Sequence, residues 1–128
     1  MPQNEEKKES VLVVEDDLFL VKTFQIRFEK MGFEVIIARD GRDAIGLLDR
    51  EPAKLVVLDL MLPSVNGFDV LSAIRANPHW KDVPVVVLTN LGQAQDMERC
   101  KKLGATEYYV KSSVKINDLM EKLDKYLD

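Results

Sequence analysis

The sequence has very few of the residues on which many active sites and cross-links depend. It contains one cysteine, Cys100, and one histidine, His79, in 128 residues. A lone cysteine cannot form an internal disulfide, and there is no Cys/His cluster for a structural zinc ion. These absences exclude a disulfide-stapled domain, a zinc-stabilised domain and most enzymes that use histidine.

Long apolar runs and an excess of positive charge are also absent. No apolar stretch approaches the roughly 20 residues of a membrane-spanning helix. Residues 1–10 are polar and lack the apolar core of a signal peptide. The formal net charge is −4, so the chain lacks the basic face with which proteins bind duplex DNA. We therefore expect a cytoplasmic protein with no direct binding to membrane or nucleic acid.

The composition that remains fits one folded domain. The 128 residues are 46% hydrophobic and 31% charged, which is typical of a single globular domain and too short for two ordinary ones. Residues 1–9 are rich in Glu and Lys and offer little to bury. We expect a flexible leader at 1–9 and a folded domain at 10–128.

Short apolar runs recur along the folded part at fairly even intervals. They lie at residues 11–14, 35–38, 55–58, 83–88 and 108–110. Most are continuous rather than alternating, which is typical of parallel strands that are covered by helices on both faces. The sequence therefore predicts a five-stranded parallel sheet.

The segments between these runs have helical periodicity. The first apolar stripe is formed by Leu20, Phe24, Phe28 and Met31. Shorter helices are expected at 41–50, 67–76 and 94–103, and a last helix follows residue 115. Asp17 and Asn66 are expected to cap helices. Alternating strands and helices predict an α/β fold with right-handed crossovers.

Polar residues stand where four of the five runs end. An acidic triplet, 15–17, follows the first run, Asp59 follows the third, Thr89 ends the fourth, and Lys111 follows the fifth. In an open parallel sheet these ends share one edge, which is where such folds bind ligands. We expect these side chains to form one site.

The residue types at this edge predict phosphoryl transfer. Neighbouring carboxylates repel one another, so they need a cation to stay ionised together. A ligand set of oxygen atoms suits Mg²⁺. Lys111 and Thr89 would stabilise an incoming phosphoryl group by charge and by hydrogen bonding. Asp59 is the candidate nucleophile, because an aspartate can form an acyl phosphate.

Four ordered motifs carry a resemblance to a known family. They are VLVVEDD at 11–17, LVVLDLMLPSVNG at 55–67, VVVLT at 85–89 and GATEYYVK at 104–111. Together they resemble the receiver domain of two-component response regulators over about residues 10–127. The resemblance implies a flavodoxin-like, doubly wound sheet of five parallel strands in the order 2-1-3-4-5, with five helices.

The resemblance also implies a phosphoacceptor and a metal site. Asp59 would accept the phosphoryl group. Glu15, Asp16, Asp59 and the backbone carbonyl of Met61 would hold Mg²⁺ as the cofactor. Apart from its own phosphorylation and dephosphorylation, such a domain catalyses nothing.

Further implied roles concern the switch and the partners. Thr89 and Lys111 would contact the phosphoryl group, and Tyr108 would act with Thr89 as a switch residue. The phosphodonor would be a histidine kinase or a histidine phosphotransfer protein. A changed protein-binding surface would then pass the signal to a downstream protein effector, and a weak homodimer is compatible with this scheme.

Two positions depart from the family pattern. Ser112 stands where a proline usually follows the lysine, and Asn90 stands where a small residue usually follows the switch hydroxyl. A cis peptide bond before a residue other than proline costs about 2.5–4 kcal/mol. We therefore expect a trans bond between Lys111 and Ser112, with Lys111 still reaching Asp59.

Other functions are weighed against this interpretation. A phosphatase with an aspartyl-phosphate intermediate generally has a second aspartate where this chain has Met61. A flavin carrier needs a phosphate-binding loop after the first strand, where the acidic triplet would repel phosphate. A degenerate receiver that acts only as a protein-interaction scaffold would not need Asp59, Thr89 and Lys111 together.

The resemblance finally suggests a long-lived acyl phosphate. The positions two residues beyond Asp59 and Thr89 would flank the path of the hydrolytic water. Here they are Met61 and Leu91, and neither side chain can orient a water by hydrogen bonding.

Overall fold

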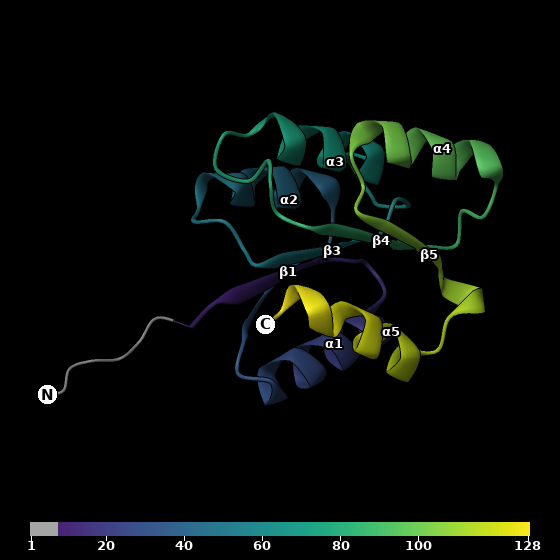
Figure 1. The fold of residues 1–128 in the computed structure, drawn as a ribbon. Coiled ribbons are helices and arrows are strands. Elements are labelled where there is room, and N and C mark those ends of the chain that lie inside the picture. Colours follow the sequence, from purple (N-terminus) through teal and green to yellow (C-terminus); the bar gives the residue numbers. More distant parts are fainter. Residues whose placement is uncertain (1–7) are drawn as a thin grey trace, which may run out of the picture.

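The computed structural model describes residues 8–128, so residues 1–7 of the predicted leader lie outside the described part. Strands and helices alternate along the chain, as predicted (Figure 1). The strands are β1 (Ser10–Val14), β2 (Glu34–Ala38), β3 (Leu55–Leu58), β4 (Val85–Thr89) and β5 (Glu107–Val110). The α-helices are α1 (Leu18–Lys30), α2 (Gly41–Gly46), α3 (Gly67–Ala76), α4 (Ala94–Leu103) and α5 (Ile116–Leu123). The 3-10 helices are η1 (Leu47–Asp49), η2 (Lys111–Ser113) and η3 (Asp124–Tyr126).

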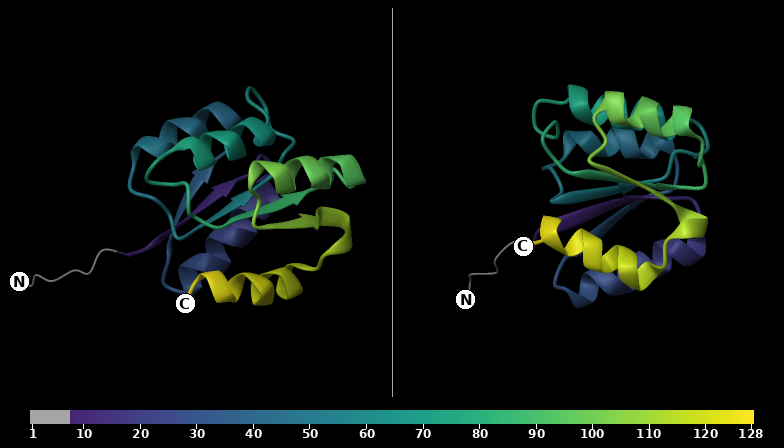
Figure 2. Two further views of the ribbon diagram at one scale, coloured as in Figure 1. Left: turned by 45° about the horizontal axis from the view of Figure 1, so that its top comes forward. Right: turned by 45° about the vertical axis from the view of Figure 1, so that its right-hand side comes forward.

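The strands form one parallel sheet in the order β2-β1-β3-β4-β5, which confirms the predicted doubly wound fold. Helices α2, α3 and α4 cover one face of the sheet, and α1 and α5 cover the other (Figures 1 and 2). Val14 pairs with Leu58, and Leu58 pairs with Val87. The carboxyl ends of β1, β3 and β4 therefore reach the same edge of the sheet.

Alternate residues of the central strands fill two separate cores. Leu12 and Val56 point to the side of α2, α3 and α4. Val13 and Val57 point to the side of α1 and α5. Because both faces are buried, almost every position of these strands must be apolar. This explains why the sequence shows continuous runs rather than alternation.

Some predicted boundaries differ from the structure. The helix expected at 41–50 is α-helical only to Gly46 and continues as η1, because glycine weakens the helix interior. Met31 was expected in the buried stripe of the first helix, but it lies just past the end of α1 and is 41% exposed. Strand β4 begins at Val85 rather than at residue 83, because Pro84 has no N–H to pair.

Both predicted helix caps are confirmed. The Oδ1 atom of Asp17 accepts a hydrogen bond from the N–H of Phe19 at 2.8 Å. The Oδ1 atom of Asn66 accepts one from the N–H of Asp69 at 3.1 Å. Each cap satisfies a backbone donor that the first turn of a helix leaves free. None of the helices in residues 8–128 is both long and apolar enough to cross a bilayer.

Arg75, near the end of α3, ties together segments that are distant in sequence. Its Nε donates to the carbonyl of Gly104 at 2.9 Å, and its Nη1 donates to the carbonyls of Lys81 and Val83 at 2.9 and 2.7 Å. Burial lowers the pKa of this guanidinium, and the charge of Asp82 opposes that effect. One side chain thus links the end of α4 to the segment that leads into β4.

We expect Arg75→Leu to lower the free energy of unfolding by about 2–3 kcal/mol, because it leaves partly buried carbonyls without a donor. Urea denaturation followed by the fluorescence of Trp80, which is buried, measures this change. The control is Arg42→Leu, which removes the same charge from an exposed position. Equal stability of the two variants would contradict the assigned role of Arg75.

Candidate functional site

The carboxyl edge of the sheet brings together three charged side chains that are far apart in sequence. Glu15 follows β1, Asp59 follows β3, and Lys111 follows β5. The Nζ of Lys111 lies 2.9 Å from Oε1 of Glu15 and 2.8 Å from Oδ2 of Asp59. The predicted gathering of these three residues at one edge is therefore present in the structure.

Glu15 is almost fully buried, with 3% of its surface exposed. Its Oε2 accepts hydrogen bonds from the backbone N–H groups of Asp16 and Asp17, both at 3.0 Å. Burial raises the pKa of Glu15, and the nearby charge of Asp59 raises it further. The bonds to Asp17 and Lys111 act in the opposite direction. Glu15 is thus held in place by the backbone and stabilised by one cation.

Asp59 is also buried, with 5% of its surface exposed, but the side chain two residues further on is exposed. Its Oδ1 accepts a hydrogen bond from the N–H of Met61 at 3.1 Å, and its Oδ2 accepts one from Lys111. Met61 itself is 57% exposed. The Asp59 carboxylate is therefore oriented by the protein while its neighbour two residues on faces solvent.

Lys111 provides the positive charge of this cluster. Burial acts to lower its pKa, but the hydrogen bonds and charges of Asp59 and Glu15 outweigh burial, so the pKa is raised. Lys111 therefore stays protonated between the two carboxylates. Its positive charge offsets the repulsion between the carboxylates of Glu15 and Asp59. The sequence predicts a metal ion in this role.

Asp16 lies apart from this pair of carboxylates. Its side chain is about half exposed, and its Oδ1 is 4.0 Å from the guanidinium of Arg39. Among residues 8–128, no three His, Cys, Asp or Glu side chains come close enough together to form a ready metal site. The sequence predicts three carboxylates close together. In the structure Lys111 joins two of them, Glu15 and Asp59, and the side chain of Asp16 faces solvent.

Thr89 and Tyr108 are linked to each other through Leu91. The Oγ1 of Thr89, which is fully buried, accepts a hydrogen bond from the N–H of Leu91 at 3.4 Å. The hydroxyl of Tyr108 donates to the carbonyl of Leu91. Burial raises the pKa of Tyr108 to about 12, so this hydroxyl stays a donor. The sequence predicts a role for the side chain of Leu91 beside the hydrolytic water, but it has no signal for this link, because the link is made by the backbone atoms of Leu91.

Asn90 and Ser112, the two positions that depart from the family pattern, lie beside Lys111. Among the described residues every peptide bond is trans, including that between Lys111 and Ser112. Lys111 nevertheless reaches Asp59. Both expectations for this segment are therefore confirmed. Asn90 and Ser112 line a hollow of about 390 Å³ together with Phe19, at the start of α1.

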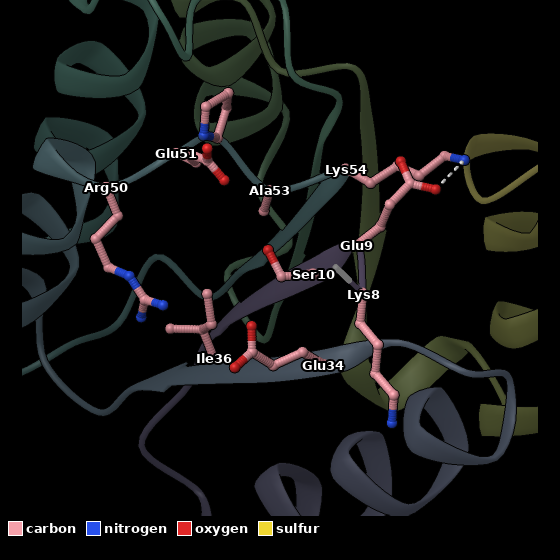
Figure 3. A pocket seen from close by; sticks show the side chains of 10 residues that line it. Lys8, Glu9, Ser10, Glu34, Ile36, Arg50, Glu51, Ala53 and Lys54 are labelled. Carbon is pink, nitrogen blue, oxygen red and sulfur yellow. Dashed lines mark hydrogen bonds and ion pairs between the residues drawn. The ribbon is translucent and has the colours of Figure 1, made fainter. Parts of the chain in front are cut away.

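A different hollow lies at the opposite edge of the sheet. It has a volume of about 520 Å³ and is formed around the first residues of β1, β2 and β3 (Figure 3). Its side chains carry both signs of charge, including Glu34 and Arg50, and Lys54 at its rim pairs with Glu9 at 3.3 Å. This hollow contains none of the site residues predicted from the sequence.

The comparisons with known proteins agree with this fold. A family model described as the response regulator receiver domain matches residues 11–124. A probable transcriptional regulator ycf27 of Galdieria sulphuraria is 33% identical over 129 residues, covering 96% of this chain and 49% of that protein. The chain spans about half the length of the first curated relatives that it matches.

Two further relatives match over most of their own length. The polar-differentiation response regulator DivK of Brucella anthropi is 29% identical over 118 residues, covering 92% of this chain and 95% of that protein. The magnesium-bound receiver domain of the sensor histidine kinase PA1611 from Pseudomonas aeruginosa has a TM-score of 0.81 and is 25% identical, covering 94% of this chain and 98% of that one. The chain therefore belongs to the receiver-domain family of two-component response regulators.

Proposed function

We propose that this receiver domain takes a phosphoryl group onto Asp59 and thereby changes a protein-binding surface. The observation that carries the proposal is the position of Lys111, whose ammonium group lies 2.8 Å from the Asp59 carboxylate at the edge of the sheet. A fixed cation at this place would attract the phosphoryl group and stabilise the charge that develops during its transfer.

The phosphodonor is a phosphorylated histidine of a kinase or a phosphotransfer protein. An oxygen of Asp59 attacks the phosphorus, the P–N bond to the histidine breaks as the O–P bond forms, and the imidazole takes up a proton. Lys111 and the hydroxyl of Thr89 then contact the phosphoryl oxygens. Beyond this transfer and the later hydrolysis of the acyl phosphate, which releases inorganic phosphate, the domain acts as a signalling module rather than as an enzyme.

The residues near Asp59 also fit a Mg²⁺ ion. They offer only oxygen donors, namely the carboxylates of Glu15, Asp16 and Asp59 and the carbonyl of Met61, which is the donor set that Mg²⁺ prefers. Burial is the main cause of the raised pKa of Glu15, and the nearby charge of Asp59 adds to it. Mg²⁺ would neutralise phosphoryl oxygens, and the similar PA1611 receiver domain holds a magnesium ion in its active site cleft. The side chain of Asp16 would have to turn inward to join the ligands.

The switch would run through the contacts of Leu91. Thr89 would turn its hydroxyl toward the phosphoryl group and release the N–H of Leu91, and Tyr108 would follow the carbonyl of the same residue. This would change the surface that α4 and β5 present to a downstream protein effector.

The folded part, residues 10–128, would act in the cytoplasm, without direct contact to nucleic acid or membrane and with at most weak self-association.

We expect Asp59→Asn to abolish phosphorylation, because an amide cannot form the acyl phosphate. The measurement is intact mass after incubation with a small phosphodonor and Mg²⁺. Removal of the metal with a chelator should stop uptake by the wild-type chain, and Asp16→Asn should mainly weaken Mg²⁺ binding in calorimetry.

Asp118→Asn, at an exposed position of α5, is the matched control and should take up phosphate normally. Uptake by Asp59→Asn at the wild-type rate would show that another residue is the acceptor. A wild-type chain that takes up none would instead favour the phosphorylation-independent scaffold.

We expect the acyl phosphate to be long-lived, because neither Met61 nor Leu91 can orient a hydrolytic water. Met61→Asn or Leu91→Glu should speed the loss of phosphate by roughly threefold to tenfold, well below the 10²–10⁴-fold range of full general acid–base catalysis. The measurement is the decay of the phosphorylated mass with time. Met97→Asn, on the exposed side of α4, is the control, and unchanged decay in both test variants would contradict the idea.

A further inference from the structure

Helix α4 buries few of its side chains against the domain. Of its ten residues only Cys100 is buried, whereas α3, of the same length, buries five. Gln93, which precedes α4, provides no side-chain cap. The other end of the helix is better fixed, because Gly104 adopts a left-handed conformation with φ of 100° and its carbonyl accepts the hydrogen bond from Arg75. Because α4 buries so few side chains, each contact that it makes with the rest of the domain has a large influence on its position.

One of these contacts joins α4 to α3 through a cation and an aromatic ring. The guanidinium carbon of Arg99 lies 4.0 Å from the centre of the Phe68 ring. Helices α3 and α4 run side by side over the same face of the sheet (Figures 1 and 2). Arg99 is exposed, whereas Phe68 is buried in the core below it. A cation over an aromatic face is attracted by the ring, and this contact is stronger when it is partly shielded from water.

Phe68 is in turn connected to the backbone of Asp59. The preceding residue, Gly67, donates its N–H to the carbonyl of Leu60 at 3.0 Å. A Cβ atom on Gly67 would lie only 2.4 Å from the carbonyl oxygen of Asp59, so the first turn of α3 rests directly against Asp59. A displacement of the Asp59 backbone therefore has to move the start of α3 and the Phe68 ring.

We propose that the Phe68–Arg99 contact is a positioning element that couples Asp59 to α4. The path runs from Asp59 through Gly67 to the ring of Phe68, and from the ring to Arg99 on α4. It differs from the path through Thr89, Leu91 and Tyr108, which runs through hydrogen bonds to the backbone of Leu91 rather than through a contact between a cation and a ring. The inference rests on the proposed function, because it requires that a group bound at Asp59 perturbs the surrounding backbone.

The test follows the amide chemical shifts of the ¹⁵N-labelled full chain when beryllium fluoride and Mg²⁺ are added. The wild-type chain should show changes at residues 59–61 and 89 and also at residues 94–103 of α4. In Arg99→Gln the changes at 94–103 should fall to less than half of the wild-type size, and those at 59–61 and 89 should remain. A purely structural role would alter the spectrum before addition but not this induced difference.

Further variants identify the ring as the partner of Arg99. Phe68→Leu keeps an apolar side chain but removes the aromatic face, so it should reduce the α4 response as Arg99→Gln does. The double variant should show no additional loss, because both substitutions break the same contact. Arg99→Lys keeps a cation over the ring and should restore part of the response. Lys102→Gln removes one exposed charge from the same helix and should respond as the wild-type chain does.

The outcomes separate this inference from the proposed function. If Arg99→Gln gives the full wild-type response at 94–103, or if Lys102→Gln loses as much as Arg99→Gln, the coupling role is wrong. A wild-type response confined to residues 59–61 and 89 also overturns the inference and leaves phosphoacceptance standing. If the wild-type chain shows no response at any residue, the proposed function is overturned as well.

Discussion

The buried contact of Lys111 with both Glu15 and Asp59 is the constraint on which the rest of the structure depends. Two carboxylates with almost no exposed surface can lie together only if a cation offsets their repulsion. That cation comes from the far end of the chain, with both distances below 3 Å. The ends of β1, β3 and β5 must therefore share one edge. The hydrogen bond from the N–H of Asp59 to the carbonyl of Val14, at 2.9 Å, holds β3 in register with β1. A slip of one residue would turn the Asp59 side chain to the other face.

Helices α3 and α4, which lie side by side, differ in how firmly they are held, and this difference suits a signalling domain. Helix α3 buries five residues and begins against the backbone of Asp59, so it keeps Asp59 in a fixed environment. Helix α4 buries only Cys100; in addition, Arg99 contacts the Phe68 ring, and Arg75 donates a hydrogen bond to Gly104 at the end of the helix. Elements with few buried contacts open and shift most easily. The proposed chemistry thus lies on the firmly packed part of the domain, and the surface proposed to respond lies on the part that buries fewer side chains.

Much of the fold could be predicted because local and tertiary requirements coincide. The apolar character of residues 55–58 is enough to predict a strand, and a parallel sheet that is buried on both faces requires such an apolar run. Asp17 and Asn66 cap helices because a short polar side chain before an apolar stripe satisfies the free N–H groups of the first turn. The failures lie at boundaries. Met31 continues the helical period, but α1 ends one residue earlier and Met31 is its C-cap, directly before Gly32 with its positive φ of 93°.

For the site, the sequence by itself determined which residues reach the carboxyl edge, since each directly ends or follows a strand and all strands run the same way. Local energetics also determined the trans bond before Ser112. Only the tertiary structure decided how the side chains pair. It placed Lys111 on Glu15 as well as on Asp59, turned Asp16 toward Arg39, and joined Arg99 to Phe68. The reason is physical: each of these pairs joins segments more than twenty residues apart. Packing of the whole domain selects such rotamers, whereas sequence patterns report only on neighbours along the chain.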